Sequence, residues 1–195
     1  MQAVVQSAWT TPYSLVTNYI SDLGNTVCAP YPQRSASYVC SPWHAAMNVS
    51  FILVGLTTMG GAVFLRRALE SSRAWWCGLG LIVIAGAGFV LVGMFPENVS
   101  LPSHKAGAAL QFVCGNLGLV VLGAALLRFR RAPGLAALAV AAGAIGLLAT
   151  VLFGTGHMLG LGTGGMERFA AYPLPAGCAV IGGWLVSPVA FRTRR

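Results

Sequence analysis

Five long apolar runs constrain this chain more than any other feature of its sequence. A helix that rises about 1.5 Å per residue needs roughly 20 apolar residues to cross a hydrocarbon core. A backbone in lipid must satisfy its own hydrogen bonds, and the runs lack the alternation of barrel strands, so we expect helices. The sequence predicts an all-α polytopic transmembrane helical bundle with spans near 44–65, 74–95, 106–127, 134–153 and 169–190.

The basic residues indicate which way these spans run. The formal net charge is +8, and nine of the twelve Lys and Arg residues lie at three ends of predicted helices. By the positive-inside rule these ends are cytoplasmic, which predicts a multi-pass protein of the cell membrane with a cytoplasmic C-terminus. Topology and attraction to anionic membrane lipids explain the charge, so we expect no nucleic-acid partner. The nine residues are Arg66, Arg67, Arg73, Arg128, Arg130, Arg131, Arg192, Arg194 and Arg195.

Paired arginines recur at a fixed spacing along the chain. Arg66–Arg67, Arg130–Arg131 and Arg194–Arg195 are 64 positions apart (130 − 66 and 194 − 130). This spacing predicts a tandem repeat of three helical hairpins, the first of which lacks its outer helix. Six spans are then expected in the full protein, and Met1–Trp9 is interpreted as the end of an earlier helix.

Residues 1–43 are predicted to form an external segment, because polar residues interrupt every apolar window in them. Cys28 and Cys40 flank a loop rich in turn-forming residues. A disulfide between them fits an oxidising environment and would contribute on the order of 2–3 kcal/mol by closing the loop. The alternative is two unpaired thiols.

Ionisable residues gather at the predicted external end, although only 8% of the chain is charged. The turn Gly93–Gly107 alone holds Glu97, His104 and Lys105. Polar groups inside a membrane are costly and normally turn toward a bundle interior or a cavity. We therefore predict a polar pocket that opens to the outer leaflet. The His and acidic residues predicted at this end are His44, His104, His157, Asp22, Glu97 and Glu167.

The predicted pocket suits a membrane-dissolved lipid or isoprenoid-like substrate. Asp22 and Glu97 are the candidate catalytic acid and base, with His44 and His104 assisting, as in terpene-cyclase-like or hydrolase-like chemistry. For each of these residues a structural role is the alternative, such as Asp22 capping a turn or pairing with Arg34. The predicted substrate-binding residues are Asn18, Asn48, Lys105, Gln111, Asn116 and Arg168.

Zinc binding and haem binding are alternatives to this hypothesis. Three His residues and a carboxylate would suit zinc, but no His-x-x-x-His or His-Glu-x-x-His spacing is present. Haem normally needs ligands at both membrane depths, so we predict neither cofactor. The competing hypothesis is non-enzymatic: an accessory or structural subunit of a membrane complex, with a protein partner or a second copy of the chain.

Three short motifs resemble those of the domain-of-unknown-function 998 family of multi-pass membrane proteins. They are Asn18–Gly24 with its Ile-Ser-Asp-Leu-Gly sequence, Phe95-Pro-Glu97, and Ser103-His104. The resemblance covers nearly the whole chain and implies six helices, whereas a clear first helix is lacking here. A more distant similarity is to Frag1/DRAM-like membrane proteins. Neither resemblance implies an established reaction.

Overall fold

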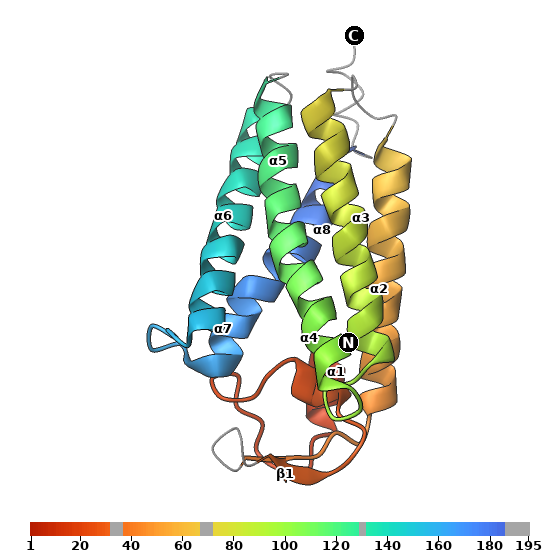
Figure 1. Cartoon of the computed structure of the whole chain (residues 1–195), viewed down its shortest axis with the longest axis vertical. Helices are drawn as coiled ribbons and strands as arrows, with labels where there is room; N and C mark the ends of the chain where they lie inside the picture. The colour runs from red at the N-terminus through yellow and green to blue at the C-terminus, as the bar shows by residue number, and fades with distance from the viewer. Residues whose placement is uncertain (32–36, 67–71, 129–131, 186–195) are drawn as a thin grey trace.

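The computed structural model describes residues 1–31, 37–66, 72–128 and 132–185. Long helices form a bundle, and the N-terminal segment covers one end of it (Figure 1). The elements in chain order are α1 (Gln2–Ser7), η1 (Ser21–Gly24), β1 (Ala29–Tyr31), β2 (Ser37–Val39), α2 (His44–Leu65), α3 (Arg73–Met94), α4 (Leu101–Ala109), η3 (Leu110–Cys114), α5 (Gly115–Arg128), α6 (Pro133–Thr155), α7 (Gly162–Ala171) and α8 (Pro173–Leu185).

Four helical stretches of the described chain are long and apolar enough to cross a membrane. They are α2, α3, the continuous run Leu101–Arg128, and α6. Their mean hydropathies lie between 1.7 and 2.4, which in water would leave large apolar faces exposed. The all-α bundle predicted from the apolar runs is confirmed, and the helices fit an integral membrane protein that crosses the bilayer several times.

The fifth predicted span, 169–190, is not one helix. α7 ends at Ala171 and α8 begins at Pro173. Proline has no backbone N–H and clashes with the preceding turn, so it interrupts a helix but suits a first helical position. α7 starts at Gly162, so Glu167 and Arg168 lie inside it rather than at the opening of the last helix. Residues 186–190 of the predicted span lie outside the described residues.

The run Leu101–Arg128 is also irregular, because its residues Leu110–Cys114 form a π-helical turn. The preceding turn packs tightly on α3, where a Cβ atom at Gly88 would lie 2.6 Å from the carbonyl oxygen of Gly107. The second helices of two predicted hairpins are therefore interrupted, at Leu110–Cys114 and between Ala171 and Pro173, whereas α2, in the first hairpin, is continuous.

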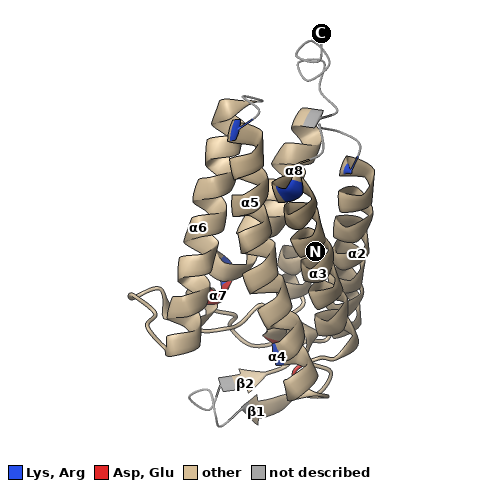
Figure 2. Ribbon diagram, turned by 45° about the horizontal axis from the view of Figure 1, so that its top comes forward, with Lys and Arg blue, Asp and Glu red and all other residues tan. Residues whose placement is uncertain are grey.

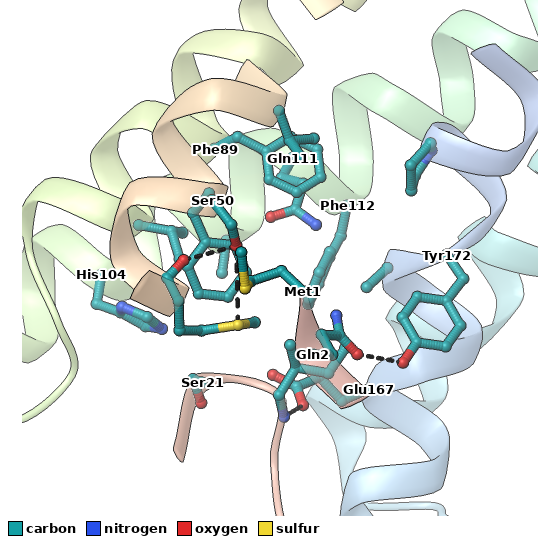
Figure 3. A pocket seen from close by; sticks show the side chains of 18 residues that line it. Met1, Gln2, Ser21, Ser50, Phe89, His104, Gln111, Phe112, Glu167 and Tyr172 are labelled. Atoms are coloured by element: carbon teal, nitrogen blue, oxygen red, sulfur yellow. Dashed lines mark hydrogen bonds between the residues drawn. The ribbon is translucent and has the colours of Figure 1, made fainter. Parts of the chain in front are cut away.

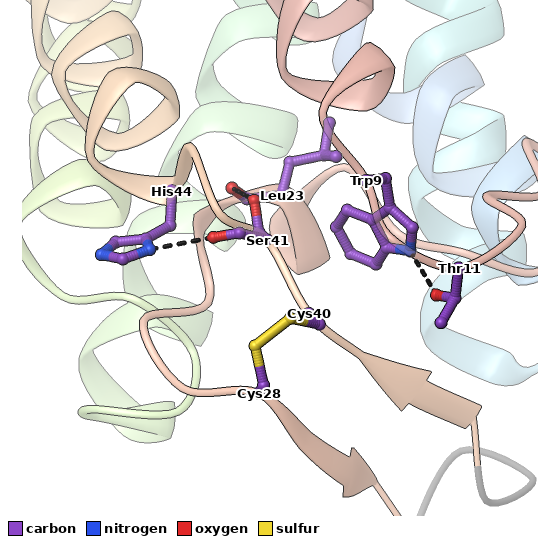
Figure 4. Close-up of a disulfide and its surroundings, with 7 residues drawn as sticks. All are labelled: Trp9, Thr11, Leu23, Cys28, Cys40, Ser41 and His44. Atoms are coloured by element: carbon purple, nitrogen blue, oxygen red, sulfur yellow. Dashed lines mark hydrogen bonds between the residues drawn. A yellow bond between two sulfur atoms is a disulfide. The ribbon is translucent and has the colours of Figure 1, made fainter.

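The N-terminal segment forms a small cap. β1 and β2 pair antiparallel, with Ala29 opposite Val39, and the Cys28–Cys40 disulfide joins the ends of this hairpin as predicted (Figure 4). The strands were not predicted, since three residues are too few to show a period-2 pattern. Ser41 Oγ donates a hydrogen bond of 2.7 Å to the Leu23 carbonyl, which ties the hairpin to η1.

Charged residues separate toward the two ends of the bundle (Figure 2). Arg66, Arg73 and Arg128 lie at one end, which we call the arginine end, because α2 and α5 finish there and α3 begins there. His44 and His104 lie in the first turns of α2 and α4 at the opposite, histidine end. The other residues of the arginine pattern, together with Arg34, lie outside the described residues: Arg67, Arg130, Arg131, Arg192, Arg194 and Arg195.

Candidate functional site

A cavity of about 240 Å³ lies inside the bundle toward the histidine end. Its apolar walls come mainly from α2, α3 and the π turn, and include Phe51, Phe89 and Phe112. The side chains of His104, Gln111 and Glu167 lie around it in Figure 3. We call this space the polar cavity; its polar lining residues are Gln2, Ser21, Ser50, His104, Gln111, Glu167 and Tyr172.

His104 is placed by the first turn of α4 and is 7% exposed. Its Nδ1 lies 2.9 Å from the Phe95 carbonyl oxygen. Because a carbonyl oxygen only accepts, we assign the proton to Nδ1, which makes Nε2 the basic nitrogen of the neutral ring. The Phe95-Pro96 turn thus fixes both the orientation and the tautomer of a histidine that lines the polar cavity.

Gln111 lines the polar cavity from the π turn and is 5% exposed. A π turn rotates one residue out of the regular helical order, and such turns occur often at functional sites. Within the described part of the chain, the Gln111 amide makes no hydrogen bond to another residue. Its amide atoms are not among the fully buried polar atoms that lack a partner, so they are open to the cavity, where a polar occupant can hydrogen-bond to them.

Glu167 lines the polar cavity from α7 and is 7% exposed. One carboxylate oxygen, Oε2, accepts a hydrogen bond from the backbone N–H of Ile20. Sequence reasoning placed Glu167 at the predicted external end but gave it no role at the site. The 64-residue spacing was the signal that could have found it, because Glu167 lies 64 positions after Ser103, next to His104 (167 − 103).

Glu97 reaches the site through a serine. Ser21 lines the polar cavity, and its hydroxyl donates a hydrogen bond of 3.1 Å to Glu97 Oε2. Since the Ile20 N–H bonds to Glu167, the start of η1 is held by two carboxylates, those of Glu167 and Glu97. The structure brings the predicted Glu97 to the edge of the site, one residue behind the cavity lining.

Asp22 is turned away from the polar cavity and is 1% exposed. Its Oδ2 accepts hydrogen bonds from the Tyr19 backbone N–H at 2.9 Å and the Asn18 amide at 3.3 Å. These bonds cap the turn that leads into η1, which is the structural alternative considered for Asp22. Asn18 is part of the same turn, and its own Oδ1 accepts from the Ser14 N–H. The predicted pairing of Asp22 with Arg34 lies outside the described residues.

Arg168 holds the N-terminal segment against α7. Its Nη1 donates to the carbonyl oxygens of Leu15, Asn18 and Gly164 at 3.1, 2.9 and 2.7 Å. Its Nη2 donates to the Tyr13 hydroxyl at 2.6 Å, and its guanidinium lies 5.7 Å from the Tyr13 ring centroid. Burial raises the pKa of Tyr13, although the nearby guanidinium opposes the shift, so the phenol stays protonated. We call these residues the Arg168 cluster; they are protein-bound and leave the polar cavity to Glu167.

Two predicted asparagines connect helices. Asn116 is fully buried and donates from Nδ2 to the carbonyl oxygens of Phe112 and Ala170, at 2.8 and 2.9 Å, which joins the π turn to α7. Asn48 donates from Nδ2 to the Gly24 carbonyl at 2.9 Å and so fixes η1 against α2. Neither residue lines the polar cavity.

The remaining predicted site residues also lie outside the cavity lining. His44 Nδ1 is 2.9 Å from the Ser41 carbonyl oxygen, inside the turn that starts α2 (Figure 4). Lys105 is exposed on α4. Among the described residues, no group of three or more His, Cys, Asp or Glu side chains is placed to hold a metal ion.

Comparison with known proteins gave one match. A family model with the description "Protein of unknown function (DUF998)" matches residues 1–186, almost the whole chain. No curated protein and no solved structure matched. The residues of the polar cavity are therefore the basis for any proposal about a ligand or a reaction.

Proposed function

The chain belongs to the DUF998 family of proteins of unknown function, and we propose that this member binds the hydroxyl-bearing end of a membrane lipid or isoprenoid alcohol in the polar cavity. The observation that carries the proposal is Gln111. Its amide is 5% exposed, lines the cavity and makes no hydrogen bond within the described chain. An occupant with a donor and an acceptor would satisfy it.

The charge of the lining favours a neutral head group. Among the described residues that line the cavity, Glu167 is the one carboxylate and none is Lys or Arg. Arg168, the nearest cationic side chain in sequence, donates to carbonyl oxygens and to Tyr13 instead. A phosphate or carboxylate would face Glu167 with no Lys or Arg among the described lining residues to compensate it, which low dielectric makes costly. A hydroxyl group can donate to Glu167 and accept from Gln111.

The same geometry supports acid–base chemistry on the bound group. Glu167 and the His104 ring line one small cavity from α7 and α4. A carboxylate and a neutral imidazole are the side chains that most often move protons near neutral pH. We propose that His104 and Glu167 act as this pair, with Glu97 positioning the cavity serine Ser21 through their hydrogen bond.

The test is ligand capture and turnover by the purified chain in lipid nanodiscs. Native mass spectrometry would identify bound lipids, and chromatography with mass spectrometry would follow conversion of added isoprenoid alcohols. Gln111→Leu keeps the approximate size of the side chain and removes its polarity, so it should retain much less ligand than wild type. Glu167→Gln should retain part of the binding and lose turnover. Lys105→Gln, at an exposed position outside the cavity, is the control.

Equal ligand recovery from wild type and Gln111→Leu would overturn the binding proposal. Recovery that depends on Gln111 without any turnover would leave a binding protein and remove only the acid–base part. Glu167→Gln then serves as the second variant, since its amide oxygen still accepts from the Ile20 N–H and the fold is maintained.

A non-enzymatic role as a subunit of a membrane complex is the second candidate, and one observation favours it. Asp22, Asn48, Asn116 and Arg168 use their polar atoms to hold the N-terminal segment and α7 in place. A structural subunit needs such internal bonds and no ligand. It predicts that purified protein carries no lipid that Gln111→Leu removes.

A further inference from the structure

A second cavity lies on the side of the polar cavity that faces the arginine end. It has a volume of about 490 Å³ and lies between α2, α3, α5 and α8. Its walls are almost entirely apolar side chains, such as Leu79, Ile82, Leu119 and Leu122. We call it the apolar cavity.

The two cavities adjoin along the bundle. Val54 of α2 and Pro175 of α8 line both of them. Pro175 sits in the first turn of α8, directly after the break between α7 and α8, so the break places the start of α8 between the two cavities. A polar compartment beside an apolar one has the polarity of an amphiphile.

The dimensions of the apolar cavity fit one hydrocarbon chain. Its lining on α2 runs from Val54 to Leu65, which at 1.5 Å per residue is about 16 Å. This is close to one leaflet of a hydrocarbon core about 30 Å thick, the depth that a single acyl or prenyl chain occupies. A volume of 490 Å³ over about 16 Å gives a mean cross-section of about 30 Å², which accommodates one hydrocarbon chain.

Two glycines keep the apolar cavity open. Gly61 and Gly182 line it, and a Cβ atom at either would meet nothing within 4 Å. By contrast, Gly55 and Gly86 lie where α2 and α3 touch, and a Cβ there would come within 3.0 Å of a neighbour. Gly61 and Gly182 are therefore not needed for close contact between helices. Their lack of a side chain leaves space in the apolar cavity that a larger residue would occupy.

We infer that the polar and apolar cavities form one site for an amphiphile with a single long hydrocarbon chain. The polar end lies at Gln111 and Glu167, and the chain extends along α2 toward Leu65. This inference rests on the proposed function for the location of the polar end. It adds the class of ligand, a long-chain alcohol, and the features of the site that select chain length.

The experiment measures which straight-chain alcohols, from octanol to octadecanol, the purified chain retains in nanodiscs when all compete together. Native mass spectrometry reads the occupancy of each. Wild type should show an optimum chain length, because shorter chains leave space in the apolar cavity and longer ones do not fit. Gly182→Leu and Gly61→Leu should shift the optimum to shorter alcohols.

The matched controls are the neighbouring glycines Gly183→Leu and Gly60→Leu. A Cβ at either position also meets nothing within 4 Å, and neither residue lines the apolar cavity. Both variants should keep the wild-type optimum. A Gly182→Leu profile identical to that of Gly183→Leu would overturn the inference. So would a wild-type protein that shows no optimum chain length.

Failure of this inference differs from failure of the proposed function. Suppose that alcohols bind and that Gln111→Leu lowers the occupancy equally at every chain length, while Gly182→Leu leaves the optimum length unchanged. In that case the proposed polar site stands, and the hydrocarbon chain of the ligand lies outside the apolar cavity. If wild type retains no alcohol and a second copy of the chain or another protein covers the apolar cavity, both proposals are overturned.

Discussion

Glu167 and Arg168 are adjacent in α7, yet they belong to two regions with opposite character. In the Arg168 cluster, the guanidinium donates to three backbone carbonyl oxygens and the Tyr13 hydroxyl. In the polar cavity, the Gln111 side chain lines the cavity wall and makes no hydrogen bond within the described chain. Both regions bury polar groups, so burial alone does not identify a binding site. The difference is that the Arg168 side chain is held by several protein hydrogen bonds, although its Nε has no partner, whereas the Gln111 side chain makes none within the described chain.

The same difference divides the other buried polar residues at the histidine end into structural and cavity-lining ones. Asn18, Asp22, Asn48 and Asn116 resemble Arg168, because their side chains bond to nearby backbone or to each other. They hold the N-terminal segment and α7 in position. His104, Gln111 and Glu167 form the cavity that this framework encloses.

The largest expected effect comes from breaking the Arg168 cluster. Arg168→Leu leaves the carbonyl oxygens of Leu15 and Asn18 and the Tyr13 hydroxyl without their charged donor. Removing hydrogen bonds to a buried charged group should cost on the order of 3–5 kcal/mol of unfolding free energy. Thermal unfolding of the protein in detergent measures this loss.

Arg168→Lys is the matched control for this variant. It keeps the charge but not the planar fork that reaches several acceptors, so it should recover only part of the stability. An Arg168→Leu protein as stable as wild type would show that the cluster contributes little and that the comparison is wrong.

The disulfide gives the next largest effect. Replacing Cys28 and Cys40 by Ser, or adding a reductant to wild type, should lower the unfolding free energy by about 2–3 kcal/mol, because the loop in the unfolded chain is no longer closed. Unfolding with and without reductant measures it. The double Ser variant should not respond to reductant; a response would trace the loss to another group.

The sequence predicted the long helices better than it predicted their interruptions. The apolar runs predicted α2, α3 and α6 within a few residues, because a membrane leaves helices as the main solution for an apolar chain. Clustering of ionisable residues indicated the histidine end, toward which the polar cavity lies. The break at Pro173 was missed because overall hydrophobicity outweighed a local proline signal.

The choice between structural and cavity-lining residues was not predictable from the sequence. Asp22 and Glu167 are both acidic residues at the same end, and their different roles follow from which backbone N–H groups reach them after folding. Gln111 was predicted as a binding residue from its helix position. The π turn that presents it has no recognisable sequence pattern.

A smaller effect separates the two regions directly. Gln111→Leu should weaken binding of a long-chain alcohol by about tenfold, or about 1.4 kcal/mol, since it removes hydrogen bonds to the ligand. Its unfolding temperature without ligand should match or exceed that of wild type, because a buried amide has been replaced by an apolar side chain. A loss of stability like that of Arg168→Leu would place Gln111 with the structural residues.

The two histidines provide the finest test of the comparison. In each, Nδ1 lies 2.9 Å from a backbone carbonyl oxygen, of Ser41 for His44 and of Phe95 for His104, yet only His104 lines the polar cavity. His44→Gln and His104→Gln should each cost about 1 kcal/mol of stability for that hydrogen bond. Only His104→Gln should also weaken ligand binding, because only His104 lines the polar cavity. Equal binding profiles for the two variants would mean that His104, like His44, does no more than hold its turn.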